Sequence, residues 1–211
     1  FVTSRQLLDR IKNELETNVS LRFEERAGNE HLLSGRGELH LAVFLENLRR
    51  EGFEFQVGKA RVIVKRIEGQ EMEPLEELVI DVEKAYNGVV MGEAGKRRGV
   101  LISQTDNPDG SMRLVFTIPT RGLLGFRSQL LTLSRGTGLM SSQFLRYDPM
   151  GAALPRLRNG VLIASDSGKA VAYGLNVAQG RGSTFIGPQT DVYEGMIVGL
   201  NAREEDIEVN V

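Results

Sequence analysis

Three arginines in a glycine-rich stretch are the residues of this sequence best suited to bind a ligand. Arg121, Arg127 and Arg135 lie in a region that has no acidic residue between Asp109 and Asp148. Arginine can place two N–H donors on one phosphate group, and glycine lets the backbone approach a ligand closely. The stretch therefore suits contact with phosphate. The alternative interpretation is an amphipathic helix whose arginines are simply solvated.

Catalytic chemistry has few candidates in this chain. The histidines are His31 and His40, there is no cysteine, and neither histidine has a Gly-x-Ser-x-Gly motif nearby. Two histidines nine residues apart do not match the spacing of a helical zinc pair. We expect both to be surface or helix-start residues, so the sequence argues against a hydrolase that relies on histidine.

Two glycine-rich segments imitate nucleotide-binding loops without completing them. Val90 stands where a P-loop ending at Gly95-Lys96 requires its first glycine, and Arg97 replaces the magnesium-binding Ser or Thr. The segment 180–182 begins a dinucleotide-binding pattern but lacks the third glycine. We therefore predict no cofactor and no metal in this chain, and no hydrolysis of GTP or ATP by a P-loop route.

The composition is that of a globular chain without an overall basic field. Its 211 residues include 41% hydrophobic and 26% charged residues, with a net charge of −2. Nucleic-acid contact would therefore depend on local patches. The absence of cysteine fits a reducing compartment, and no apolar run approaches a membrane span. The chain begins at Phe1 without a Met, so we expect a piece of a longer protein.

The first 70 residues show the order helix, strand, strand, helix, strand. A capping box at Thr3 to Gln6 precedes a helical apolar face, and alternating residues from Val19 predict a strand with a hairpin partner near 32–33. A second helix is expected over 38–51, followed by a strand in which Phe53, Phe55 and Val57 alternate and after which Val62 and Val64 follow. Phe53 and Phe55 loosely match an RNA-binding aromatic strand, but we interpret them as core.

The pattern starts again after residue 71. Strands are expected near 78–82, 100–104, 114–118 and 139–144, and helices near 87–96 and 121–134. The turn Asn107-Pro108-Asp109-Gly110 marks a hairpin between the middle strands. This order is the split βαβ, or ferredoxin-like, unit. Beyond Pro155, short apolar runs broken by glycine predict an all-β barrel or sandwich element, with runs at 161–164, 170–175, 184–186 and 196–200.

Several motifs resemble one family of translation factors. Residues 34–41, Ser-Gly-Arg-Gly-Glu-Leu-His-Leu, resemble the turn that opens the second helix in the third domain of elongation factor G-type GTPases. The Arg-Gly-Leu-Leu-Gly-Phe-Arg of residues 121–127 and the Arg-Gly-Thr-Gly of 135–138 resemble the fifth domain of the BipA/TypA branch. Four motifs resemble that branch's own C-terminal domain: Asn159-Gly160, Ala172–Leu175, Arg181–Ser183 and Val192–Met196.

The resemblance implies an α+β chain of three domains. Residues 1–70 would be a ferredoxin-like domain lacking its first strand, residues 71–155 a second ferredoxin-like domain, and residues 156–211 a truncated β-rich domain. The family's GTPase domain and β-barrel are absent from the sequence, so GTP and magnesium would bind outside it and the fragment would have no enzymatic activity. The linker over 151–155 is less polar than the family leads us to expect.

The resemblance also implies partners. These are the 70S ribosome, its rRNA and the A-site tRNA, with no membrane or DNA partner, and a monomeric, cytoplasmic fragment with roles in ribosome assembly and stress. Cations of the second and third domains would contact RNA phosphates, which position a protein without reading sequence. The candidates are Lys96, Arg97, Arg98, Arg121, Arg127, Arg135, Arg156, Arg158, Lys169 and Arg181.

A second hypothesis uses the same fold for a different purpose. Ferredoxin-like domains can pair through sheet edges or bind small ligands, so the chain could be a regulatory or oligomerisation module. A thermal shift with a small ligand and no association with ribosomes would favour this module.

Overall fold

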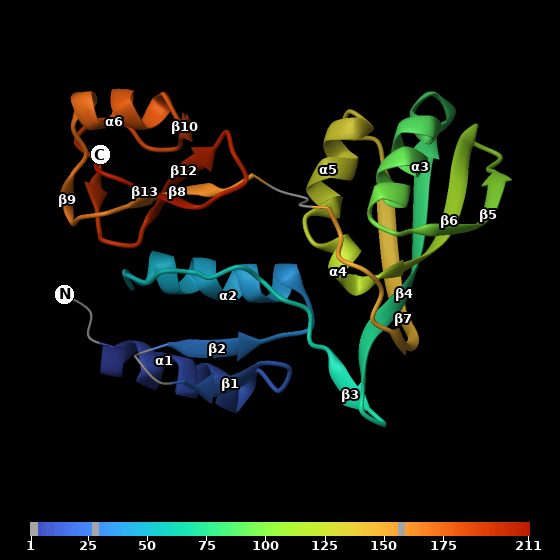
Figure 1. Ribbon diagram of the computed structural model, residues 1–211, viewed down its shortest axis with the longest axis horizontal. Helices are drawn as coiled ribbons and strands as arrows, with labels where there is room; N and C mark the ends of the chain where they lie inside the picture. The colour runs from blue at the N-terminus through green and yellow to red at the C-terminus, as the bar shows by residue number, and fades with distance from the viewer. Residues whose placement is uncertain (1–3, 27–29, 156–158) are drawn as a thin grey trace. The chain divides into compact units, whose positions relative to one another are not determined.

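The computed structural model describes residues 4–26, 30–155 and 159–211 (Figure 1). Contacts within the chain divide it into two compact units. One unit, called here the terminal unit, combines residues 1–60 with 159–211, and the other, the central unit, spans residues 61–158. The architecture is mixed α+β with several small sheets.

The central unit is built on an antiparallel sheet with the spatial order β7-β4-β6-β5, and β3 pairs with the start of β4. Taken in chain order, the fourth, first, third and second strands of a split βαβ unit are neighbours, which confirms the ferredoxin-like prediction for this region. Its elements are β3 (Lys65–Ile67), β4 (Gln70–Glu83), η1 (Lys84–Tyr86), α3 (Asn87–Lys96), β5 (Val100–Asp106), β6 (Ser111–Pro119), α4 (Thr120–Leu123), α5 (Phe126–Leu133) and β7 (Leu139–Pro149).

The core of the central unit lies between this sheet and its helices. Leu78, Ile80 and Val82 alternate along β4 and are buried, as the period of two predicts. They share one cluster with four residues of β6 and with apolar residues of α3 and α5, which places both helices on the same face of the sheet (Figure 1). The helix residues of the cluster are Val90, Ala94, Phe126 and Leu130.

The helix predicted over 121–134 is in fact two helices. α4 ends at Leu123 and α5 begins at Phe126, and Gly125 between them has φ of +68°. This left-handed conformation cannot continue an α-helix, and glycine adopts it at low cost. The apolar residues still reach one core, because each short helix turns its own apolar side toward the sheet.

The first part of the terminal unit has the predicted order of helix, strand, strand and helix. α1 (Ser4–Thr17) and α2 (Glu38–Arg50) flank the antiparallel pair of β1 (Arg22–Glu25) and β2 (His31–Ser34). Ile11, Leu21, Phe44 and Leu48 form its buried core.

The strand predicted from Val19 is present but begins at Arg22, and the strand predicted after the second helix is wrong. Val19 is 89% exposed in a turn before β1. Residues 53–64 form no strand: Phe53 and Phe55 pack on the helical core, whereas Val57 and Val64 are exposed, and the backbone has no partner strand. Phe53 and Phe55 are partly buried against that core, which confirms their interpretation as core residues. A ferredoxin-like domain over residues 1–70 stays a prediction.

The C-terminal part of the terminal unit is rich in short strands but is not all-β. A sheet of order β10-β12-β8-β13 lies beside the two-stranded pair β9 and β11. The run predicted as a strand over 170–175 instead enters α6 (Ala172–Gln179), because Leu175 and Ala178 are buried at helical spacing. The strands are β8 (Val161–Ala164), β9 (Gly168–Lys169), β10 (Gly182–Thr184), β11 (Asp191–Val192), β12 (Ile197–Asn201) and β13 (Ile207–Val209).

Candidate nucleic-acid interface

Arg97, predicted as a phosphate contact, is an internal residue of the central unit. Its side chain is 1% exposed, and its Nε donates to Glu93 Oε1 at 3.0 Å. Nη1 donates to the carbonyl oxygens of Gly122 and Leu124 at 2.8 and 2.9 Å, and Nη2 donates to the Gln129 side chain. The prediction for Arg97 is therefore wrong: its donors hold the break between α4 and α5 and cannot also bind a ligand.

Arg121 is also used within the protein. Its guanidinium forms an ion pair with Glu73, which is 5% exposed, and Nη2 donates to the carbonyl oxygens of Gly151 and Ala152 at 3.2 and 2.8 Å. The backbone amide of Gly151 donates to Glu73 Oε1 at 2.8 Å. These bonds fasten the exit of β7 to the start of β4, so the prediction of Arg121 as a free phosphate contact is corrected to a structural role.

The Glu73 carboxyl gives the central unit an acid-sensitive contact. Burial raises the pKa of Glu73, but hydrogen bonds from Arg121 and from the Gly151 amide outweigh burial and lower the pKa below its usual value. A carboxyl with a lowered folded pKa stabilises the fold above its unfolded pKa of about 4.3 and loses that contribution as the pH falls through the folded value.

We therefore expect the free energy of unfolding to drop in acid, partly through Glu73. Urea unfolding measured from neutral pH to acid should show a smaller acid-dependent loss in Glu73→Gln, whose stability at neutral pH is already reduced. Glu77→Gln, at a partly exposed position of the same strand, should keep the acid dependence of the parent chain. Equal acid dependence in Glu73→Gln and the parent would contradict the prediction.

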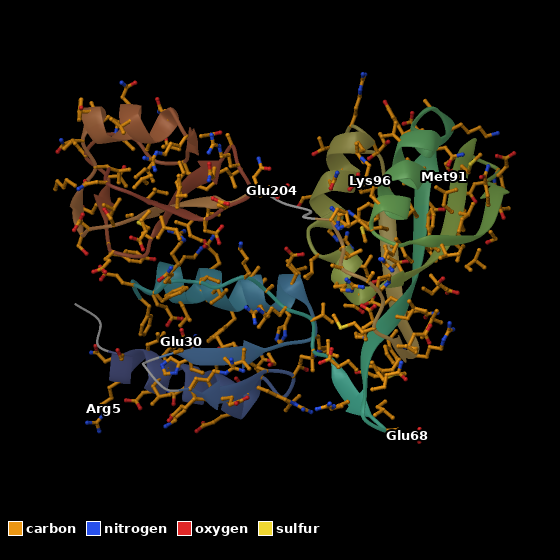
Figure 2. The ribbon with its side chains drawn as sticks, in the orientation of Figure 1. Arg5, Glu30, Glu68, Met91, Lys96 and Glu204 are labelled. Carbon is orange, nitrogen blue, oxygen red and sulfur yellow. The ribbon has the colours of Figure 1, made fainter. Side chains whose placement is uncertain are left out.

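Four predicted cations of the central unit are exposed. Lys96 is 70% exposed, with Nζ 3.4 Å from Glu93 Oε2, and its position at the end of α3 is labelled in Figure 2. Arg127 is exposed and its Nη2 donates to the carbonyl of Met140 at 3.2 Å. Arg98 and Arg135 are exposed, and no ion pair of either is recorded within the described ranges. These four residues are therefore accessible to a polyanion.

Arg98 and Arg135 have an unusual backbone. Their φ angles are +63° and +52°, and each follows the end of a helix and precedes a glycine. The left-handed conformation costs a residue with a Cβ roughly 1–2 kcal/mol, whereas glycine loses roughly 0.5–1 kcal/mol in chain entropy on folding.

Arg135→Gly and Arg98→Gly should therefore each raise the free energy of unfolding by about 0.5–1 kcal/mol. Urea unfolding of each variant measures this change. Lys96→Gly is the matched comparison, because Lys96 ends α3 in helical conformation and should lose about 1 kcal/mol. Destabilisation by Arg135→Gly and Arg98→Gly would show that side-chain contacts outweigh the backbone cost.

The remaining predicted cations lie in the C-terminal part of the terminal unit. Lys169 is 61% exposed, with Nζ 3.8 Å from Asp191 Oδ1. Arg181 is exposed, and no ion pair is recorded for it in the described part of the chain. Arg156 and Arg158 lie outside the described residues. The described candidates thus lie on several separate elements of the two units.

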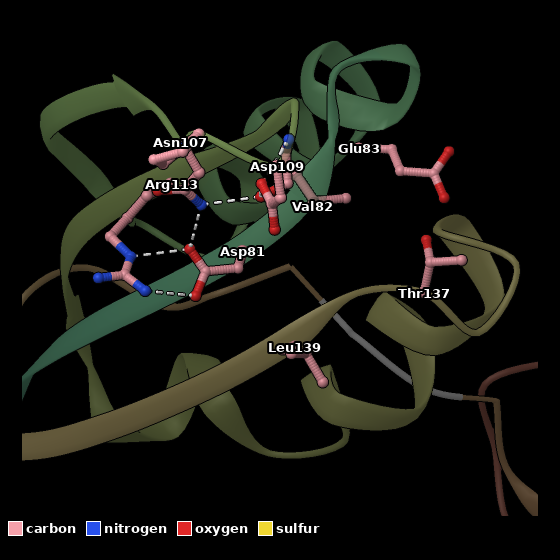
Figure 3. Close-up of a pocket in the computed structure, with 10 residues that line it drawn as sticks. Asp81, Val82, Glu83, Asn107, Asp109, Arg113, Thr137 and Leu139 are labelled. Carbon is pink, nitrogen blue, oxygen red and sulfur yellow. Dashed lines mark hydrogen bonds and ion pairs between the residues drawn. The ribbon is translucent and has the colours of Figure 1, made fainter.

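A cavity of about 450 Å³ opens at one end of the central sheet (Figure 3). Arg113 donates to both carboxylate oxygens of Asp81 at 2.8 Å, and Asn107 Nδ2 donates to Asp81 Oδ1 at 3.1 Å. Asp109 accepts from the backbone and hydroxyl of Ser111. Arg113 is neutralised by Asp81, and Glu83 and Asp109 add further carboxyl groups to the wall, so this cavity does not suit an anion.

The two histidines have structural contacts. His40 Nδ1 accepts from the backbone amide of Arg36 at 3.2 Å, and its Nε2 lies 3.1 Å from Asn18 Oδ1. His31 lies against Phe23, with the ring centroids 5.3 Å apart. Within the described ranges, no three His, Asp or Glu side chains gather as a metal site requires. No helix among the described residues is long and apolar enough to cross a membrane.

The sequence analysis did not predict the glutamates that form ion pairs with Arg97 and Arg121. Glu93 lies four residues before Arg97, a spacing that could have suggested an ion pair. Glu73 stands in an acidic run that looks like a solvated strand, and its partner Arg121 is 48 residues away, so local pattern carries no signal for it. Arg203 was also missed, although it lines a cavity with Arg181.

Comparison with known proteins matches the chain in two adjoining segments. Residues 70–157 match the family model of the elongation factor G C-terminus, and residues 159–211 match that of the TypA/BipA C-terminal domain. The chain is 47% identical over its whole length to a Synechocystis protein, 45% to one from Bacillus subtilis and 47% to one from Escherichia coli K12, each named large ribosomal subunit assembly factor BipA. It spans 35–36% of the length of these relatives.

Proposed function

Because the chain belongs to the BipA/TypA family and corresponds to the C-terminal portion of its members, we propose that it docks on the large ribosomal subunit by contacting rRNA. The observation that carries this proposal is the similarity of the whole chain, at 45–47% identity, to proteins named large ribosomal subunit assembly factors. The sequence as given holds no complete P-loop.

The exposed cations of the central unit supply the proposed contact. Lys96, Arg98, Arg127 and Arg135 are exposed residues, whereas Arg97 and Arg121 donate hydrogen bonds to backbone carbonyl groups of the same unit. The left-handed backbone of Arg98 and Arg135 costs stability that glycine would recover, which is expected where the side chain serves binding. Phosphate contacts of this kind fix the orientation of a protein on RNA.

Docking of this portion would serve the activity of the whole protein. We propose that GTP and magnesium bind in another part of that protein, and that docking couples GTP hydrolysis there to ribosome assembly or to translation under stress. A contact with A-site tRNA belongs to the same proposal.

A pelleting experiment with purified large ribosomal subunits tests the proposal. The variant Lys96→Gln/Arg98→Gln/Arg127→Gln should bind at least about tenfold more weakly, and the slope of log affinity against log salt should fall by about one for each lost phosphate contact. The control Lys84→Gln/Arg113→Gln/Arg146→Gln loses the same charge from the same unit. In the parent chain these three cations form ion pairs with Asp106, Asp81 and Asp148, respectively. The affinity of the control variant for the ribosomal subunits should therefore change little.

Two outcomes would contradict the proposal. A parent chain that does not sediment with the subunits at low salt would remove docking from this portion. Equal losses in the two triple variants would show that only total charge matters, and the assignment to Lys96, Arg98 and Arg127 would fail.

A further inference from the structure

Two arginines line a cavity of about 400 Å³ in the C-terminal part of the terminal unit. Arg181 follows α6 and precedes β10, and Arg203 follows β12. Gly180, Asn201, Glu205 and Ile207 are among the other residues of the wall. All of these residues lie between Gly180 and Ile207, in one part of the terminal unit.

The backbone holds the two arginine positions beside each other. β10 pairs with β12 so that Gly182 lies opposite Asn201, and the Ala202 amide donates to the carbonyl of Arg181 at 2.8 Å. Asn201 is 3% exposed; its Oδ1 accepts from the Arg203 amide at 3.1 Å and its Nδ2 donates to the Glu205 carbonyl. The side-chain amide of Asn201 therefore orders the loop after β12. The backbone positions of Arg181 and Arg203 are fixed beside each other.

The two arginines of this wall differ from several other arginines of the described chain in their ion pairing. In the described part of the chain no ion pair is recorded for Arg181 or Arg203, although Arg10, Arg97 and Arg121 each have a carboxylate partner. Glu205 lines the cavity but forms no recorded ion pair with either arginine. Asp206 on the same loop is 3.1 Å from Lys59 Nζ and accepts from the Val161 amide at 3.0 Å. Among the described residues, two arginines and one glutamate thus line this cavity.

We propose that this cavity binds a phosphate group through Arg181 and Arg203. Each guanidinium is a planar fork that matches phosphate oxygens, and an anion between the two would relieve their mutual repulsion. A cavity of about 400 Å³ admits a phosphate together with part of an attached sugar. If the proposed ribosome docking holds, the ligand is a phosphodiester of rRNA, and this part of the inference rests on that function; free phosphate offers the same chemistry.

Two probes test the cavity with the whole chain. The first is inorganic phosphate, whose effect on the melting temperature is compared with that of chloride at equal ionic strength. The second is a fluorescently labelled single-stranded RNA, whose affinity is followed by anisotropy against salt. The test variant is Arg181→Gln/Arg203→Gln. The matched control, Arg22→Gln/Arg36→Gln, removes the same charge from two exposed arginines of the same unit.

We expect phosphate to raise the melting temperature of the parent and of the control but not of the test variant. RNA affinity should fall about tenfold in the test variant only, and its salt slope by about 0.7, the value for one single-strand phosphate. A loss of the phosphate effect with unchanged RNA affinity also supports the cavity and identifies free phosphate as its ligand. An unchanged phosphate effect in the test variant would overturn the proposal. The phosphate arm uses no ribosome, so it can succeed even if ribosome docking fails.

Discussion

Replacing Arg97 by methionine is expected to lower the free energy of unfolding of the central unit by about 3–5 kcal/mol, the usual loss when one partner of a buried ion pair is removed. Glu93, 8% exposed, would keep a buried charge without its main partner. The carbonyl groups of Gly122 and Leu124 would lose their donor. Urea unfolding of the variant, with hydrogen exchange to assign the change to residues 87–133, measures the effect.

Two further variants separate the charge from the hydrogen bonds. Glu93→Gln/Arg97→Met should recover part of the loss, because it removes the buried charge but leaves the two carbonyl groups unsatisfied. Arg113→Met breaks an ion pair whose arginine is 52% exposed, so it should lower the stability far less than Arg97→Met does. If Arg97→Met were no more harmful than Arg113→Met, Arg97 would not hold the break between α4 and α5.

Gly182→Ala is expected to lower the free energy of unfolding by about 3 kcal/mol, at the upper end for a small-to-large change in a packed site. A Cβ at Gly182 would overlap the carbonyl oxygen of Leu200 and lie 2.9 Å from Asn201 Cα. Both neighbours are backbone atoms of β12 and cannot turn aside as a side chain can. The β10–β12 pairing would have to open, and with it the position of Arg181 beside Ala202.

Gly168→Ala is the matched control for this prediction. Gly168 lies in β9 of the same part of the chain, and a Cβ there would meet no atom within 4 Å. Its substitution should change stability by about 0.5 kcal/mol or less. Thermal or urea unfolding of both variants checks the prediction. Equal stability of the two would mean that β10 and β12 do not approach as closely as described.

Elements whose apolar residues follow a clear period were predicted well. Leu78, Ile80 and Val82 alternate in the sequence and share the buried face of β4, and the turn at 107–110 joins β5 and β6. Residues 53–64 show why the same signal can fail. Alternation reports that one side of a segment is buried, but it does not report whether another strand is present to pair with its backbone.

The candidate RNA-contacting cations also show the difference between what a local pattern predicts and what the fold decides. Lys96, Arg97 and Arg98 are consecutive and look equivalent in the sequence, yet only Arg97 is buried. Its acceptors at Gly122, Leu124 and Gln129 are 25 to 32 residues away along the chain. Such partners become neighbours only when α3 and α5 pack on the sheet, so the role of each cation could not be deduced from composition or spacing.

The sequence by itself determined the family, the ferredoxin-like order of the central unit and the apolar residues of its core, because these depend on motifs and on periods that are local in the chain. The tertiary structure alone decided which arginines are internal, where the 121–134 helix breaks, and that Arg181 and Arg203 line one cavity. These features depend on contacts between residues distant in sequence. Ion pairing and burial are properties of the folded surroundings of a side chain, and the chain's local pattern does not encode them.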